Sequence, residues 1–212
     1  DRDTRKQAQL ACQISLGLMA GIFSILPTAA ASPVQDTTST GKAIQSGNFK
    51  INQSGTTDKG GTLTAITSES TNNVIPWKDF SVGAKEKVQF DNGQKTNNYL
   101  NVVTGANTSH IAGTVEGGKN VYIVNQHGVI IDKDATVNVG NLYVSTKPVN
   151  DAMKTAFTSG KEASAVLSAA TDAAVSDVVN LGTIQAANVQ VEGKNIRFLN
   201  SANVKTTDGA VN

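Results

Sequence analysis

The sequence of 212 residues predicts an all-β fold of the right-handed parallel β-helix class, with an N-terminal β cap and a short, partly helical excursion outside the helix. Charged residues make up 17% of the chain and aromatic residues 5%, while Gly, Asn, Thr and Ser fill much of the remainder. This composition suits many short strands joined by tight turns. An alternating apolar pattern and an internal repeat support the same fold class.

Residues 1–31 have the pattern of a secretory signal peptide. A weakly basic start precedes a mostly apolar segment at residues 14–26, and an Ala-rich run then offers a cleavage site between Ala31 and Ser32. The apolar segment is shorter than the roughly 20 residues that a membrane-spanning helix needs, so we favour a cleaved leader. The sequence does not begin with Met, and we expect its true start to lie upstream.

Cysteine use and net charge exclude several kinds of chemistry. The single cysteine, Cys12, lies in the leader and precedes its apolar segment, so neither a lipoprotein anchor nor a thiol in the mature chain is expected. The net charge of +1 gives no field directed at nucleic acid. We therefore expect no cofactor, no metal and no nucleic-acid partner.

Residues 32–47 are rich in Ser, Thr, Gly and Gln and are interpreted as a loose lead-in to a domain spanning residues 48–212. From residue 48 onward, short runs alternate between apolar and polar positions, with Gly, Asn or Asp between most runs. A period of two predicts strands with one buried face. The apolar pairs are Phe49 and Ile51, Leu63 and Ile66, Val88 and Phe90, Val121 and Ile123, Val129 and Ile131, Val137 and Val139, and Leu142 and Val144.

Residues 151–179 break this pattern. They are Ala-rich, and the spacing of apolar positions such as Val166, Leu167 and Ala170 favours one or two helical turns over a strand. We interpret the segment as an excursion that packs against the sheet surface, with strands resuming from Gly182.

An internal repeat indicates a solenoid, in which each coil buries its apolar face by stacking on its neighbours. Residues 118–121 (GKNV) match residues 193–196 (GKNI), and residues 187–189 (ANV) match residues 202–204 (ANV). Asn side chains at equivalent turns of such a solenoid can stack in hydrogen-bonded ladders. A β-sandwich is the alternative, but sandwiches usually carry a more aromatic core and no repeat of coil length.

The two ends of a β-helix expose unpaired backbone, which must be covered. Residues 48–66 and hairpin-like segments between Trp77 and Phe90 are the candidates for an N-terminal cap. At the other end the sequence stops just after a strand-like run with no capping helix, so we expect the natural protein to continue with further coils.

Four segments, in order, resemble the secretion domain of two-partner-secreted exoproteins, the class of filamentous haemagglutinin and the high-molecular-weight adhesins. They are residues 75–83 (IPWKDFSVG), residues 88–90 with 101–105 (VQF and NVVTG), residues 109–115 (SHIAGTV) and residues 121–146 (VYIVNQHGVIIDKDATVNVGNLYVST). The corresponding family patterns begin I-x-W-x-x-F-x-I-G, N-R-V-T-G, S-x-I-x-G-x-L and V-F-L-I-N-P-N-G. Residues 180–184 (NLGTI) also resemble the family's N-x-G-x-I coil start.

The resemblance implies an N-terminal secretion module without catalytic activity. Family members cross the inner membrane through the general secretory translocon and are then engaged by a cognate outer-membrane β-barrel transporter of the TpsB type (Omp85 family) through its periplasmic POTRA domains. They fold outside the cell, which implies a secreted or surface location in a diderm bacterium. Contacts with host or neighbouring cells would lie in the region beyond residue 212.

The resemblance also implies particular site residues. Asn101, Asn125 and Gly128 are expected to act in transporter recognition or folding, and Trp77 and Phe80 in packing of the cap or core. The family's N-P-N-G turn is N-Q-H-G here at residues 125–128, so Asn and Gly keep their turn roles without the Pro.

For the other polar residues, a structural role in a turn or at the surface is favoured over a catalytic or metal-binding one. Asp132 and Asp134 could form a carboxylate or calcium pair, but a solvated turn is favoured because no further acidic cluster accompanies them. His110 and His127 could act in acid–base chemistry or bind metal, yet neither has a partner four residues away. The alternative function, a carbohydrate-active β-helix enzyme of the pectate-lyase type, is disfavoured because Arg197 is the only Arg after the leader.

Overall fold

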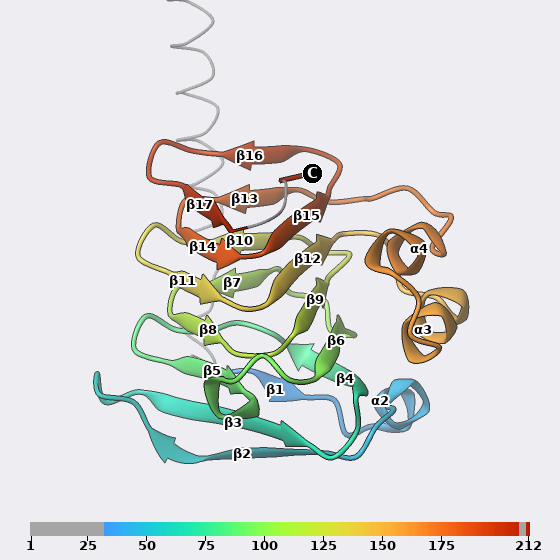
Figure 1. Ribbon diagram of the computed structural model, residues 1–212, viewed down its shortest axis with the longest axis horizontal. Coiled ribbons are helices and arrows are strands. Elements are labelled where there is room, and N and C mark those ends of the chain that lie inside the picture. The colour runs from blue at the N-terminus through green and yellow to red at the C-terminus, as the bar shows by residue number, and fades with distance from the viewer. Residues whose placement is uncertain (1–31, 208–210) are drawn as a thin grey trace, which may run out of the picture.

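The computed structural model describes residues 32–207 and 211–212, which coil through three sheets (Figure 1). Sheet A contains β1 (Val34–Gln35), β4 (Asn72–Asp79), β6 (Asn98–Val103), β9 (Asn120–Val124), β12 (Asn141–Ser145) and β15 (Asn188–Glu192), in that order. Sheet B contains β2 (Phe49–Thr56), β3 (Thr62–Ser68), β5 (Lys87–Phe90), β8 (Thr114–Glu116), β11 (Thr136–Asn138), β14 (Thr183–Ala186) and β17 (Asn203–Thr206). Sheet C contains β7 (Ser109–Ile111), β10 (Val129–Ile131), β13 (Val178–Asn180) and β16 (Ile196–Phe198).

The chain coils through sheet B, then sheet A, then sheet C, although the first coil meets sheet C only through a single bridge from Val82 to Ile111. Every strand pair between successive coils is parallel. The predicted parallel β-helix is therefore confirmed. Side chains in register form inward rows, such as Val88, Val115, Val137 and Ile184 in sheet B. Because the side chains alternate, these rows fill a continuous apolar core along the axis.

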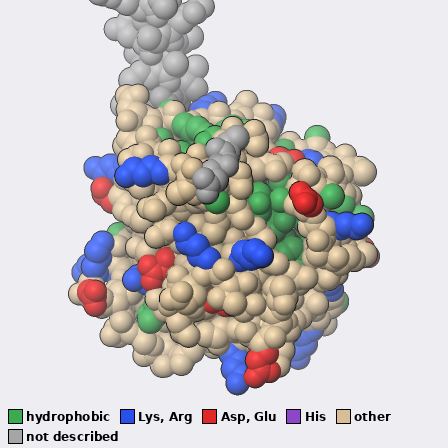
Figure 2. Space-filling model, in the orientation of Figure 1, with side chains coloured by type: hydrophobic (Ala, Val, Ile, Leu, Met, Phe, Trp, Pro, Cys, Tyr) green, Lys and Arg blue, Asp and Glu red, His purple; other side chains and the backbone are tan. Residues whose placement is uncertain are grey.

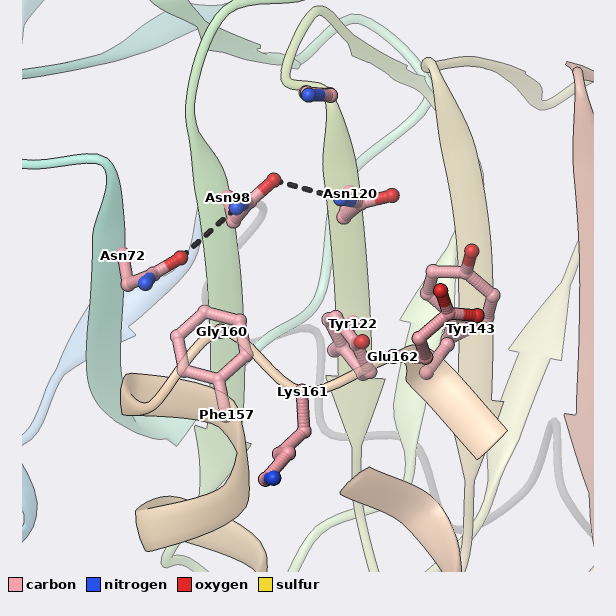
Figure 3. Close-up of a pocket in the computed structure, with 11 residues that line it drawn as sticks. Asn72, Asn98, Asn120, Tyr122, Tyr143, Phe157, Gly160, Lys161 and Glu162 are labelled. Carbon is pink, nitrogen blue, oxygen red and sulfur yellow. Dashed lines mark hydrogen bonds between the residues drawn. The ribbon is translucent and has the colours of Figure 1, made fainter. Parts of the chain in front are cut away.

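A ladder of asparagines runs along the start of sheet A, as Figure 3 shows for three of its rungs. Each side-chain amide donates to the amide oxygen one coil below, at 2.8 Å for three bonds and 3.0 Å for the last. The rungs are Asn72, Asn98, Asn120, Asn141 and Asn188. The predicted stacking of Asn side chains is thus present.

The repeat that suggested the solenoid does not match equivalent positions. Asn120 opens β9 in sheet A, whereas Asn195 precedes β16 in sheet C. Likewise Asn188 opens β15 in sheet A, but Asn203 opens β17 in sheet B. The true equivalents in sheet A are the ladder residues, separated by 26, 22, 21 and 47 positions.

Three helices cover the outer face of sheet A: α2 (Ser39–Ile44), α3 (Asp151–Thr158) and α4 (Ala163–Ser168) (Figure 1). The Asn150 side chain caps α3 by accepting from the Met153 N–H at 2.8 Å. Met153 and Phe157 of α3, with Val166 and Leu167 of α4, pack on the outward side chains of the sheet in a second apolar cluster. Sheet A is thus buried on both faces, and the excursion packs as predicted.

The N-terminal end is capped by antiparallel strands. β2 pairs with β3, and β1 pairs with β4, so residues 48–66 contribute to the cap as predicted. The hairpin expected between Trp77 and Phe90 is wrong, because β4 lies in sheet A and β5 in sheet B as successive strands of the coiled path. The excursion ends earlier than predicted, since β13 already begins at Val178.

The lead-in is ordered rather than loose. It forms β1 and α2, and the Thr38 side chain accepts from the Gly41 N–H at the start of α2. The Asp36 N–H also donates to the Pro76 carbonyl at 3.0 Å. The proposed signal peptide lies outside the described residues. Among those described, no helix is long and apolar enough to span a bilayer.

We predict that the middle of the asparagine ladder stabilises the fold more than its end. Asn120→Ala removes a donor to Asn98 and an acceptor for Asn141, which should lower the free energy of unfolding by about 1–3 kcal/mol. Asn188→Ala loses only the side-chain bond to Asn141, because the bond from its backbone N–H remains, and should cost about half as much. Urea unfolding of both variants checks this. A loss for Asn120→Ala no larger than that for Asn188→Ala would contradict the prediction.

Candidate functional site: the corner between sheets A and C

Three of the four motif segments contribute to one corner of the solenoid, where the chain turns from sheet A to sheet C, and the segment at residues 109–115 begins directly after it. We call this stack of turns, residues 79–81, 104–108, 125–128, 176–177 and 193–195, the A–C corner. Polar contacts join every level of it to the next. They run from Asn107 Nδ2 to Asp79 Oδ2 (3.2 Å), from Asn125 Nδ2 to the Asn107 carbonyl (2.9 Å), from Ser176 Oγ to the Gln126 carbonyl (2.5 Å) and from Asn195 Nδ2 to Asp177 Oδ1 (2.8 Å).

Trp77 and Asn101 form a buried polar pair beside the corner. The Trp77 Nε1–H donates to Asn101 Oδ1 at 2.9 Å, and Asn101 Nδ2 donates to the Tyr122 carbonyl at 3.0 Å. Trp77, Asn101 and Phe80 are all 0% exposed. The Trp77 and Phe80 rings meet edge to face, 5.4 Å apart. Asn101 therefore links three successive coils from inside the core. Its side chain is inaccessible to a binding partner in the folded state.

The Thr-Gly pair that follows Asn101 ties the lead-in to the coils. Thr104 Oγ1 lies 2.6 Å from Asp36 Oδ2 and 3.1 Å from the Trp77 carbonyl. Asp36 Oδ1 also accepts from the Thr38 N–H at 2.9 Å. A side chain at Gly105 would overlap the Lys78 carbonyl oxygen, so only glycine lets these two turns approach.

The pKa of Asp36 lies below its ordinary value. The hydrogen bond from Thr104 is the largest cause and that from the Thr38 hydroxyl the next, because both favour the charged carboxylate. Burial opposes this shift, while the Thr38 N–H and the positive charge of Lys78 add to it.

Asn125 and Gly128 form the ends of a turn that is held from below. Asn125 Oδ1 accepts from the His127 N–H at 2.8 Å, and the Gly128 N–H donates to the Asn125 carbonyl at 3.0 Å. Asn125 Nδ2 also reaches Ser109 Oγ of β7 at 3.0 Å. Gly128 has a φ of +103°, a conformation that favours glycine. Asn125 is 0% exposed, and the tip residues Gln126 and His127 face solvent.

The remaining candidates are dispersed. His110 Nε2 lies 3.4 Å from Asp132 Oδ2 one coil away, a pairing that spacing along the chain did not reveal. His127 lies at an exposed turn, where its carbonyl accepts from the Thr108 hydroxyl at 2.7 Å, and Asp134 is exposed. No group of three or more metal-ligating side chains occurs in residues 32–207 or 211–212. Ala31 lies outside the described residues, and Ser32 Oγ donates to Glu86 Oε2 at 2.7 Å.

Sequence reasoning missed Asp36 and gave Thr104 no separate role. Thr104 belongs to the NVVTG motif segment, and its place in that motif was the one indication of a role. Asp36 lies 68 positions away in a segment interpreted as loose, so nothing in the local pattern connects it to Thr104. Ser109 and Asn107, the partners of Asn125, were likewise visible only once the coils were stacked.

The fold and the corner together define a capped parallel β-helix module whose recurrent motif side chains serve coil stacking. The TPS secretion domain family matches residues 31–212. The chain belongs to this family of two-partner secretion domains.

Two relatives show how small a part of a larger protein such a chain represents. It is 37% identical over 73 residues to the heme/hemopexin-binding protein of Haemophilus influenzae, covering 34% of this chain and 8% of that protein. It is 33% identical over 132 residues to the 16S rRNA endonuclease CdiA of Enterobacter cloacae, covering 56% of this chain and 4% of that protein. The chain thus spans less than a tenth of the length of either relative.

A solved structure is also similar. The HMW1 secretion domain of Haemophilus influenzae matches with a TM-score of 0.47 and 22% identity, over 72% of this chain and 44% of that one.

We predict that Asn101→Leu destabilises the domain although it preserves side-chain size. The Trp77 Nε1–H would be left buried without an acceptor, and the Tyr122 carbonyl would lose a donor. The free energy of unfolding should fall by about 2–4 kcal/mol in urea titrations. Gln126→Ala, at the exposed turn tip, is the control and should stay within about 0.5 kcal/mol of the parent. An Asn101→Leu variant as stable as this control would show that the pair is dispensable.

We predict that acid weakens the junction between the lead-in and the coils. The folded pKa of Asp36 is lowered relative to the ordinary value of about 3.9, so its stabilisation is complete above that value and is lost as the pH falls through the folded pKa. Asp36→Asn should therefore flatten the loss of stability below about pH 4. Urea midpoints measured between about pH 2 and pH 6 check this. Identical pH profiles for parent and variant would refute it.

Proposed function

We propose that this chain is the N-terminal secretion module of a larger exported surface protein, recognised by a cognate outer-membrane β-barrel transporter and nucleating β-helix folding outside the cell. The family match over residues 31–212 supports this proposal. The main structural observation in its support is that the motif residues Asn101 and Asn125 are 0% exposed once the coils have stacked.

Burial of these motif side chains has a consequence for recognition. A transporter that reads Asn101 or Asn125 must meet them before the coils close, on an unfolded or partly folded chain. An extended segment can add as a strand to an exposed sheet edge in the transporter's periplasmic POTRA domains, where backbone hydrogen bonds supply affinity. The same side chains then stabilise coil stacking after export.

The route that we propose divides the chain into parts. Residues 1–31 act as a signal peptide for the general secretory translocon, with cleavage between Ala31 and Ser32. Residues 32–47 form the lead-in, and residues 48–212 form the secretion domain, with an extra-helical insertion at residues 151–179 and further coils beyond residue 212. The Asp36 contact to Thr104 makes the lead-in part of the cap on which later coils stack.

In this proposal, the activity of the larger exported protein comes from the regions that follow this module in the chain. Binding of host molecules and delivery of a contact-dependent toxin are both compatible with the relatives. The module itself acts without catalysis. A carbohydrate-active β-helix enzyme would carry clustered acids with Arg or Lys on one coil face, whereas Asp132 here contacts His110 and Asp134 faces solvent.

We predict that export depends on the transporter and on the corner turn. The full chain should reach the medium only when co-expressed with the barrel transporter encoded beside its natural gene. Asn125→Ala and Gly128→Ala should lower the secreted amount, because the first removes the contacts to Asn107 and Ser109 and the second strains a positive φ. Immunoblots of medium and periplasm measure this, with Gln126→Ala as the control.

Two outcomes would overturn the proposal. Equal secretion without the transporter would remove the assigned partner. Unchanged export of both turn variants would remove Asn125 and Gly128 from the recognition or folding motif.

A further inference from the structure

A cavity of about 330 Å³ lies between the outer face of sheet A and the turn that joins α3 to α4 (Figure 3). Its floor carries three rungs of the asparagine ladder (Asn72, Asn98 and Asn120) and two tyrosines, and its other wall comes from the excursion. The lining residues on which the argument depends are Asn98, Asn120, Tyr122, Tyr143, Lys119 and Glu162. Asn98 and Asn120 serve coil alignment and the two tyrosine rings pack under the excursion, but their remaining amide and hydroxyl groups have no role in either.

The two tyrosine hydroxyls in the lining have no hydrogen-bond partner in the described part of the chain. Tyr122 is 3% exposed and Tyr143 is 9% exposed, and their rings pack 4.7 Å apart. Burial raises the pKa of both, so both hydroxyls keep their protons and remain able to donate. The rings are buried, but the two hydroxyl oxygens open onto the cavity, where they can bond to water or to a ligand.

The asparagine ladder leaves hydrogen-bonding capacity at regular intervals. Each side-chain amide has two N–H donors and an oxygen with two lone pairs. Within the ladder, Asn98 and Asn120 each donate one hydrogen and accept one. These two rungs thus each have one donor and one acceptor to spare, and they lie about 4.8 Å apart on neighbouring strands. Such a row matches a ligand whose groups both donate and accept.

The charges around the cavity favour a neutral ligand. Lys119 and Glu162 bring opposite signs to its lining. The Lys161 side chain runs away from the asparagine row in Figure 3, so it adds no cation beside the amides. Figure 2 likewise shows charges of both signs interspersed over one face of the molecule, without a continuous patch of either. The groups that face the cavity along the asparagine row, the amides and the two tyrosine hydroxyls, are uncharged, which matches a polyhydroxyl ligand.

We propose that this cavity, formed by the asparagine ladder, Tyr122, Tyr143 and the α3–α4 turn, binds a neutral saccharide of one or two sugar units. Sugar hydroxyls both donate and accept, as the spare groups of the ladder and the tyrosines require. The volume lies at the lower end of the range for small-molecule sites. The site exists only after β9, β12 and the excursion have come together, so it belongs to the folded protein outside the cell.

The test uses the full folded chain on an array of neutral and acidic glycans, followed by saturation-transfer NMR with glucose, galactose, N-acetylglucosamine, lactose and cellobiose. Inorganic phosphate and acetate serve as charged probes. At least one neutral saccharide should bind. Tyr122→Phe and Tyr143→Phe should each weaken its affinity about threefold to tenfold, the effect of losing one hydrogen bond.

Tyr99→Phe is the matched control, because Tyr99 lies in the inner core of the β-helix and its hydroxyl already donates to Asp91 Oδ1 at 2.5 Å. This variant should lose stability and keep its saccharide affinity, whereas the two cavity variants should keep or gain stability. Absence of saccharide binding, binding of the charged probes alone, or affinity unchanged in both cavity variants would each overturn the proposal. None of these results would bear on transporter-dependent export.

Discussion

The register between coils is the constraint on which the rest of this structure depends. A single coil has three short strands, and it can pair their backbones and cover its inward side chains only against a neighbouring coil. The first coil has no such neighbour, which is why β2 and β1 run antiparallel to β3 and β4 at that end. Four large aromatic side chains, Trp77, Phe80, Phe90 and Tyr99, are concentrated in the first two coils, where the cap must be self-sufficient.

Polar side chains set this register where apolar rows alone would allow slippage. A row of Val and Ile tolerates displacement by two residues, which keeps the same face inward, but an amide that donates to one fixed oxygen does not. The asparagine ladder fixes the start of sheet A in this way, and Asn125 fixes the A–C corner through Asn107 and Ser109. Asn101 does the same inside the core. The abundance of Asn in this family member is thus a property of coil alignment.

Local patterns were sufficient for part of this architecture. Alternating pairs such as Val88 and Phe90 predicted strands because one face of each strand points into the core. Sheet A is different: residues 73–77 of β4 and 121–124 of β9 are buried without interruption, because the inner core and the helices cover opposite faces. Pro76 adds to the difficulty, since proline usually argues against a strand. It is tolerated here because β4 lies near the N-terminal edge, with only β1 beyond it.

The coil equivalences and the cap contacts could not be predicted from the chain alone. Unequal intervals of 26, 22, 21 and 47 residues conceal the asparagine row, while a chance similarity between residues 118–121 and 193–196 imitates a repeat. The Asp36 contact spans 68 positions and depends on where Thr104 comes to lie. For the candidate site, the motif segments identified Asn101 and Asn125, but their burial and their partners required the stacked coils.

The excursion shows how such a solenoid can gain a surface without disturbing its register. It leaves after β12 and returns before β13, and the two ends meet at the A–C corner. Thr146 Oγ1 donates to the Ser176 carbonyl at 2.8 Å, and the Val175 N–H donates to the Thr146 carbonyl at 3.3 Å. Because the segment closes on itself at this point, its helices can cover Tyr122 and Tyr143 while β13 continues in register with β10. The cavity therefore combines a floor of ladder residues, which coil stacking already uses, with a second wall that the excursion adds to the coil.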